Sequence, residues 1–375
     1  MSAATPGATA AQSSPPTERA PRPALSVDRA TLARIAQAAD ELDRHPAFPD
    51  DAFRALAAAG VLGATLPGCD GRRARFAEEL RAVQLISRAD GSVGRILDGH
   101  LNAVERLAVA CPGALDAGDR AAIAAGTLLL GVWGADPAPG EGEPARLRGT
   151  GDATTLHGVK TFCSGAGGLG RALVVARDDA GDRRLAYVDV TRGVCIDRSW
   201  YRAAGLRASE SHRVVFDGAP VLALLGAAGE ILREPWFSRD AIRTSATWAG
   251  IAGSVVDAGL EFLRERGTPS ETVTLAAGRM LVALGTIQRW LEHAGARAEN
   301  ETPLAGLAIE ARWAIAAAAR EIAAEAGLAC GSRPLATGGA LSRGRRDLDL
   351  FLLQHRLEPQ LARHGANALG AGRGR

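Results

Sequence analysis

The sequence carries no marked excess of either charge. Lys and Arg number 44 against 42 Asp and Glu, which gives a formal net charge of +2 over 375 residues. Proteins that bind nucleic acid present a sustained positive field to the phosphates, and this balance cannot supply one. The composition therefore argues against nucleic acid as a partner.

Cysteine is scarce and scattered. The five cysteines are far apart in the sequence, with no Cys-x-x-Cys pair and no Cys/His cluster at the spacing of metal ligands. We therefore predict neither a disulfide framework nor a metal site.

Long hydrophobic runs are also missing. The apolar stretch 314–326 is interrupted by Arg320 and Glu321, well short of the length that crosses a bilayer. Residues 1–25 are rich in Ala, Pro, Ser and Thr and lack the basic start and apolar core of a signal peptide, so we predict a disordered tail there. A cytoplasmic protein with no membrane partner is expected.

What is present is a large apolar fraction, 47%, enough for an extensive core. Apolar residues alternate with period two only between about 127 and 220, and helical periodicity lies on both sides. The pattern predicts a mainly α protein with three folded parts: an N-terminal helical domain (26–125), a middle β-barrel or sandwich (126–225) and a C-terminal four-helix bundle (226–375). Bundle helices are expected over 236–266, 271–297, 303–330 and 343–368.

Three fragments follow one another in the order of a known family. They are Phe162-Cys163-Ser164, the turn Gly205-Leu206-Arg207-Ala208-Ser209, and Arg343 with the pair Arg346-Asp347. With the α, β, α layout, they resemble the acyl-CoA dehydrogenase superfamily of flavoproteins over roughly 30–370. The resemblance implies that FAD lies between the β domain and the bundle, and that the chain forms a homotetramer or homodimer.

The resemblance also implies the residues that bind cofactor and substrate. The segment Trp133-Gly134-Ala135 stands at a flavin-facing loop, although Ala135 replaces the family's Thr. Phe162, Cys163 and Ser164 would lie against the ring, since an aromatic side chain can cover its face and a hydroxyl can bond its polar edge. Arg266 stands near the arginine that reaches the cofactor of a neighbouring subunit. Arg207 and Ser209 are the implied substrate-binding residues.

The expected catalytic glutamate is missing. A dehydrogenase of this family needs a carboxylate to remove the α-proton of an acyl thioester while hydride passes to flavin. In the commonest branch that Glu follows the Arg-Asp pair by eight residues, and His355 stands there. In a second branch it lies on an earlier helix, and the corresponding residue is Asp240. Glu358 is a weaker candidate.

The histidines keep an alternative open. Two-component flavin monooxygenases on the same fold receive reduced FMN or FAD from a reductase and activate oxygen, and they resemble this chain in carrying a His near His355 and polar groups near His100. We therefore hold two enzyme hypotheses: first, oxidation of an acyl thioester or similar group, and second, monooxygenation of a small molecule. A third is a non-catalytic paralogue that serves as a scaffold.

The glycines at 165, 167 and 170 match G-x-G-x-x-G, which elsewhere marks a dinucleotide site. That motif requires a helix directly after it, because the pyrophosphate rests on the helix N-terminus. Residues 171–177 read as a strand that runs into a turn, so we do not expect a Rossmann site.

Overall fold

The computed structural model describes residues 25–68, 71–354 and 356–370. Most of the predicted N-terminal tail and the candidate His355 lie outside these ranges. No helix of the described ranges is both long and apolar enough to span a membrane. Within the same ranges, His, Cys, Asp and Glu side chains form no group of three or more that could hold a metal ion.

Helices occupy the first third of the chain, as the periodicity predicts. They are α1 (Arg29–Arg44), α2 (Asp50–Ala58), α3 (Phe76–Ala89), α4 (Gly91–Glu105) and α5 (Ala117–Ala125), and α4 continues as a π-helical turn (Arg106–Ala110). The break between α3 and α4 is made by Asp90, whose side chain accepts a hydrogen bond of 2.9 Å from Val93 N. This N-cap satisfies a backbone donor at the start of α4.

The middle of the chain forms a closed sheet. Its strands are β1 (Leu130–Trp133), β2 (Arg146–Arg148), β3 (Thr155–Cys163), β4 (Arg171–Arg177), β5 (Arg183–Asp189), β6 (Val194–Asp197) and β7 (His212–Leu225). Strands β4, β2, β3, β7 and β5 pair in a ring, β1 adds to β4, and β6 adds to β7. The predicted barrel is thus confirmed. Its pairing is mixed, however, because β4 runs parallel to β1 and β2.

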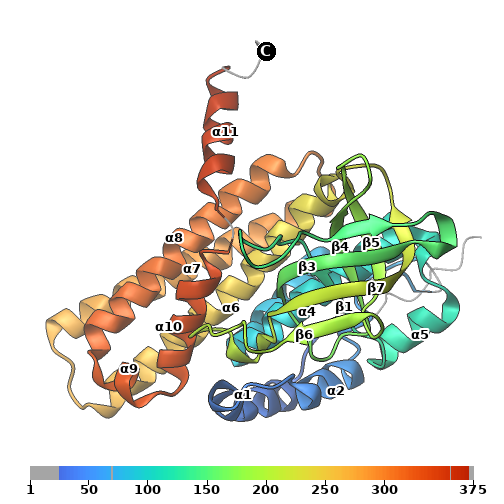
Figure 1. Ribbon diagram of the computed structural model, residues 1–375. Helices are drawn as coiled ribbons and strands as arrows, with labels where there is room; N and C mark the ends of the chain where they lie inside the picture. The colour runs from blue at the N-terminus through green and yellow to red at the C-terminus, as the bar shows by residue number, and fades with distance from the viewer. Residues whose placement is uncertain (1–24, 69–70, 355, 371–375) are drawn as a thin grey trace, which may run out of the picture.

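Four long helices make the C-terminal bundle (Figure 1). They are α6 (Trp236–Glu265), α7 (Glu271–Arg297), α8 (Ala305–Cys330) and α10 (Ala340–Phe351), with the short α9 (Arg333–Thr337) between the last two. The single helix predicted over 343–368 is wrong. Helix α10 ends at Phe351. A separate helix, α11 (Glu358–Ala368), begins after it and has Pro359 in its first turn, where proline is tolerated.

Helix α4 joins the two halves of the molecule, because it contacts both β1 and α6. In Figure 1 α4 lies behind the strands, the bundle lies to the left of the sheet, and α11 projects away from the body. The turn that resembles the family's Gly-Leu-Arg turn meets α10 at the same junction. There Leu206 N donates to Asp347 Oδ1 at 2.5 Å. Two of the three fragments of the resemblance, which are distant in the sequence, are therefore in direct contact.

Candidate functional site

A cavity of about 590 Å³ opens where the sheet, α4 and the bundle meet. Its volume falls in the range of small-molecule sites. Helix α4 contributes Arg95, Gly99 and Asn102, which share one face because they are spaced four and three residues apart. The other lining residues come from the sheet edge, α6, α8, α10 and α11: Val132, Gly134, Ala135, Phe162, Ser164, Tyr201, Leu206, Ser211, Ile231, Phe237, Asp240, Ala241, Thr244, Arg312, Leu350, Phe351, Leu353, Gln354 and Gln360.

The wall formed by the sheet presents an exposed aromatic ring. Phe162 has a positive φ of 51°, and its side chain is 46% exposed at the cavity. Its ring meets Trp200 edge-on, with the centroids 4.9 Å apart. Nearby, Lys160 is fully buried and binds Asp136 at 2.6 Å, which ties the loop of Gly134 and Ala135 to β3. Phe162 is thus held by the ring of Trp200 on one side, and the loop beside it is held by the ion pair of Lys160 and Asp136.

Hydroxyl groups form a short chain beside this ring. Ser164 Oγ lies 2.8 Å from Ser211 Oγ, which lies 2.7 Å from Ser209 Oγ. Ser164 and Ser211 reach the cavity, whereas Ser209 is fully buried behind them. The predicted substrate residue Ser209 therefore supports the other two hydroxyls, and only Ser164 and Ser211 of these three serines line the cavity.

Asp240 on α6 is the carboxylate of the cavity. Its Oδ2 is held by Arg106 at 2.6 Å, while its Oδ1 accepts no hydrogen bond from any described residue and lies 3.7 Å from Arg243 Nη1. Burial raises the pKa of Asp240 to about 6, against the opposing pull of Arg106 and Arg243. A carboxylate that lines the cavity, is held in one orientation and has a pKa near neutrality suits a group that accepts a proton.

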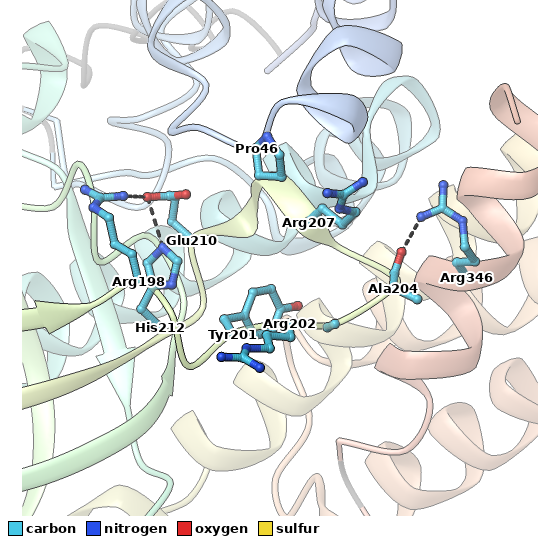
Figure 2. A pocket seen from close by; sticks show the side chains of 10 residues that line it. Pro46, Arg198, Tyr201, Arg202, Ala204, Arg207, Glu210, His212 and Arg346 are labelled. Atoms are coloured by element: carbon cyan, nitrogen blue, oxygen red, sulfur yellow. Dashed lines mark hydrogen bonds and ion pairs between the residues drawn. The ribbon is translucent and has the colours of Figure 1, made fainter.

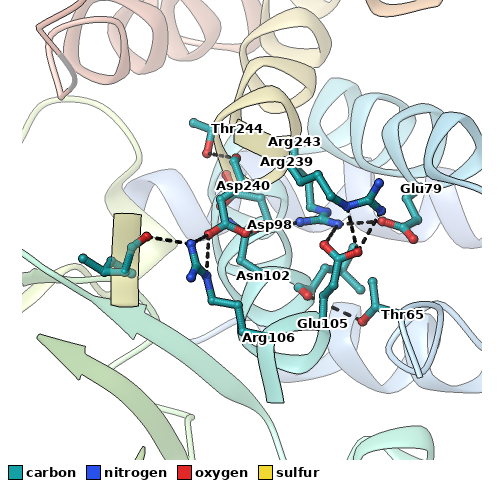
Figure 3. A network of polar contacts seen from close by, with 12 residues as sticks. Thr65, Glu79, Asp98, Asn102, Glu105, Arg106, Arg239, Asp240, Arg243 and Thr244 are labelled. Atoms are coloured by element: carbon teal, nitrogen blue, oxygen red, sulfur yellow. Dashed lines mark hydrogen bonds and ion pairs between the residues drawn. The ribbon is translucent and has the colours of Figure 1, made fainter. Parts of the chain in front are cut away.

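A buried ionic network holds Asp240 in position (Figure 3). Arg243 is fully buried and contacts Glu79 at 2.7 Å and Glu105 at 2.8 Å, and Arg239 binds Glu105 at 2.7 Å. Although burial opposes ionisation, these arginines hold the pKa of Glu105 well below its ordinary value. The charged groups thus anchor α3, α4 and α6 to one another around Asp240.

A second hollow, of about 660 Å³, lies behind the loop that carries the Gly-Leu-Arg turn (Figure 2). We call it the basic basin, and Arg198, Arg202, Arg207, His212 and Arg346 line it together with Glu210. Arg198 binds Glu210, and Arg346 binds Asp43 at 2.5 Å and the carbonyl of Ala204. The predicted residue Arg207 lies here, and the basin shares only Tyr201 with the cavity.

Several predicted residues line the cavity and others do not. Gly134, Ala135, Phe162, Ser164 and Asp240 meet around it. Trp133 and Cys163 instead point into the core, where Trp133 Nε1 donates to Ser164 O at 3.0 Å. Arg266 caps the far end of α6 and packs over Phe262. It contacts neither hollow in this chain.

His100 is engaged in the fold. It is fully buried, its Nε2 lies 3.0 Å from Leu62 O, and its Nδ1 accepts from Leu130 N at 3.1 Å. Burial lowers its pKa to about 4, so the ring stays neutral near pH 7. Both ring nitrogens are occupied by backbone groups, and the residue does not reach the cavity. In this geometry His100 holds backbone groups of the fold, and its catalytic role stays a prediction.

The sequence reasoning missed Arg312 and Asn102. Arg312 lines the cavity from α8 although its side chain is 2% exposed. A signal was present, because it stands on the apolar face of an Ala-rich helix, four residues after Ala308 and three before Ile315. A lone charge on such a face must meet a partner or a ligand.

Comparisons with known proteins agree with this architecture. Residues 24–111 match the family described as acyl-CoA dehydrogenase, N-terminal domain. The search of curated proteins found no match.

Three solved structures share the fold over nearly the whole chain. KijD3 in complex with FMN and a dTDP-linked amino-keto sugar has a TM-score of 0.78 and 24% identity, covering 91% of each chain. The dibenzothiophene monooxygenase TdsC from Paenibacillus sp. A11-2, bound to FMN and indole, has a TM-score of 0.79 and 18% identity over 91% of this chain and 96% of its own. The methanesulfinate monooxygenase MsuC from Pseudomonas fluorescens has a TM-score of 0.75 and 21% identity over 92% and 96%.

These similarities establish the fold. The chain has the acyl-CoA dehydrogenase fold, and the resemblance predicted from its three fragments is confirmed at that level.

Proposed function

We propose that the protein is a flavin-dependent oxidoreductase, and that it oxygenates a small polar substrate with reduced flavin and O₂. The observation that carries the proposal is Asp240, the carboxylate that lines the same cavity as the exposed ring of Phe162 and has a pKa of about 6. The monooxygenases TdsC and MsuC, which share the fold, support the oxygenase alternative.

The residues at the cavity fit a flavin. Phe162 offers an exposed aromatic face to a flat ring, and Ser164 offers a hydroxyl to the polar edge of such a ring. Space is available on the α4 side, because a side chain at Gly99 would meet no atom within 4 Å. When bound, the flavin supplies the redox chemistry. The crystallised complexes of KijD3 and TdsC contain FMN, so we propose FMN as the cofactor in preference to FAD.

The residues of the chain supply proton control and orientation. Asp240 lines the cavity and is placed to take a proton from the substrate, while Arg106 binds its Oδ2 and so fixes the direction of the carboxylate. Asn102 and Thr244 line the cavity beside Asp240 and offer polar contacts to the substrate. Phe237 and Phe351 line it as well, and their apolar side chains exclude water from the reacting groups.

Oxidation of an acyl thioester, the first hypothesis from the sequence, also has a base in Asp240. The wall of the cavity favours the oxygenase, since Arg312 reaches the cavity with two guanidinium nitrogens that have no hydrogen-bond partner among the described residues. An acyl chain leaves such a group without a partner, which costs binding energy.

The test uses purified protein, FMN and FAD, under nitrogen and then in air. We expect the protein to bind reduced FMN more tightly than oxidised FMN, and to give an absorbance band on mixing with oxygen that belongs to neither free form. A preparation that arrives yellow with tightly held FAD, is reduced by acyl-CoA and reacts slowly with oxygen would establish the dehydrogenase instead. Binding of neither flavin would leave the scaffold hypothesis.

A further inference from the structure

Arg312 is a buried cation without a hydrogen-bonded partner. Its side chain is 2% exposed, and its Nε and Nη2 are buried with no hydrogen-bond partner among the described residues. The guanidinium carbon lies 5.1 Å from the ring centroid of Trp248, and the residue lines the cavity. Burying a charge in this way is costly unless an opposite charge accompanies it.

The charges around Arg312 do not cancel. Arg95 also lines the cavity and is paired with Asp98 at 2.7 Å, and Asp98 in turn accepts from Thr247 at 3.1 Å. Asp98 also attracts Arg312 electrostatically, so one negative charge is shared by two arginines, which leaves one positive charge in excess at this end. Burial lowers the pKa of Arg312 to about 10, so the group remains charged at neutral pH.

The excess cation lies at some distance from the base. Asp240 and Trp248, the tryptophan that packs against Arg312, are eight residues apart on α6, which is about 12 Å along the helix axis at about 1.5 Å per residue. Asn102 and Thr244 line the cavity beside Asp240. A molecule of one or two aromatic rings has the length to reach from one end towards the other.

We propose that Arg312 is the receptor for an anionic head group, and that the substrate is a small organic anion, carrying a carboxylate or a similar planar oxyanion, whose other end points to Asp240. A guanidinium binds such a group through two parallel N–H donors. That the bound anion is the substrate rests on the proposed function. It adds the chemical class, which neither the fold nor the comparisons provide.

The experiment compares benzoate with benzamide, two probes of the same shape that differ in charge. Binding to the flavin-free protein is measured by calorimetry and by the shift of the melting temperature. We expect benzoate to bind at least about tenfold more tightly than benzamide, and Arg312→Met to abolish that preference, since a charge-assisted hydrogen bond contributes a factor of this size. The control is Arg320→Met, an exposed arginine on the same helix, which should behave as the wild type.

Equal affinity for the two probes, or an unchanged preference in Arg312→Met, would overturn the assignment. If Arg312→Met fails to fold, Arg312→Lys, which keeps the charge but loses the two parallel donors, should weaken the preference for benzoate, and an undiminished preference would count against the receptor. If either variant loses FMN binding while benzoate binding stays intact, Arg312 binds the flavin, and this result would also overturn the assignment. FMN binding to the wild type is measured separately. A wild type that binds no FMN but still prefers benzoate would therefore contradict the proposed function and leave the anion receptor standing.

Discussion

At the scale of single residues, Asp240 is the group whose protonation should control the reaction. Asp240→Asn keeps the size and the contact with Arg106 but removes the base. We expect turnover to fall by about 10²- to 10⁴-fold, the usual contribution of such a group, with FMN affinity unchanged. The measurement is substrate-dependent oxygen uptake with reduced FMN, across a panel of small carboxylates. A variant with wild-type turnover would remove Asp240 from the mechanism.

The same residue predicts a pH dependence. Because the pKa of Asp240 is raised to about 6, its carboxylate is charged above that pH and protonated below it. The catalytic rate of the wild type should therefore fall as the pH drops through about 6 and level off above it. In Asp240→Asn the remaining catalytic rate should not show this fall below about pH 6. A wild-type profile that is flat between pH 5 and 7 would contradict the assignment.

His100 makes a prediction about stability. Its folded pKa of about 4 lies below the ordinary value of 6.5, so the folded state prefers the neutral ring. That contribution is fully present above pH 6.5 and is lost as the pH falls from 6.5 towards 4. His100→Gln should lower the melting temperature at pH 7, because two backbone hydrogen bonds are disturbed. The difference in melting temperature between the wild type and the variant should be smaller at pH 5. A gap that widens at low pH would argue against a neutral buried ring.

At the scale of elements, the contact between the turn and α10 depends on a glycine. A Cβ at Gly205 would collide with the backbone of Arg346 and Asp347, so the loop lies directly on the helix only because no side chain is present. We expect Gly205→Ala to destabilise the protein by about 3 kcal/mol, as overpacking does. Gly278→Ala is the matched control, since that position of α7 has open space, and it should stabilise the helix by roughly 0.5–1 kcal/mol. Denaturant unfolding of both variants compares the two effects.

Much of the architecture could be predicted at this scale because long elements carry strong periodicity. The bounds of α6 and α7 fall within a residue of those expected. The strands β2 and β6 have only three and four residues, too few for an alternation to be visible, so the closure of the sheet could not be derived from them. Pro359 signalled the end of the helix predicted over 343–368, and its position in a first turn could have placed the start of α11.

The candidate site was harder to predict than the fold. Phe162, Ser164 and Asp240 were found through the resemblance, and all three line the cavity. Whether a polar side chain points to a cavity or to a backbone group depends on neighbours that are distant in sequence. For this reason the contacts of His100 with Leu62 and Leu130 could not be predicted, and Arg312 was overlooked on an apolar helix face.

At the scale of the whole molecule, the predicted homotetramer or homodimer remains a prediction. The outer face of α7 carries apolar side chains that are more than half exposed in the single chain: Leu275, Leu281 and Val282. We expect this face to be covered by another copy, since apolar groups of this kind mark interfaces when they cluster. Light scattering after gel filtration should give a multimer, and Val282→Asp should reduce its mass. A monomeric wild type would contradict this expectation.

The central claim is that a flavin binds between the sheet and the bundle and reacts with oxygen there. The most direct measurement mixes the protein with reduced FMN under nitrogen, records the affinity, and then follows the spectrum after air is admitted. Our account predicts tight binding of reduced FMN, weaker binding of oxidised FMN, and a band that persists beyond the oxidation of free FMN. Binding of neither form, or oxidation at the rate of free FMN, would contradict it.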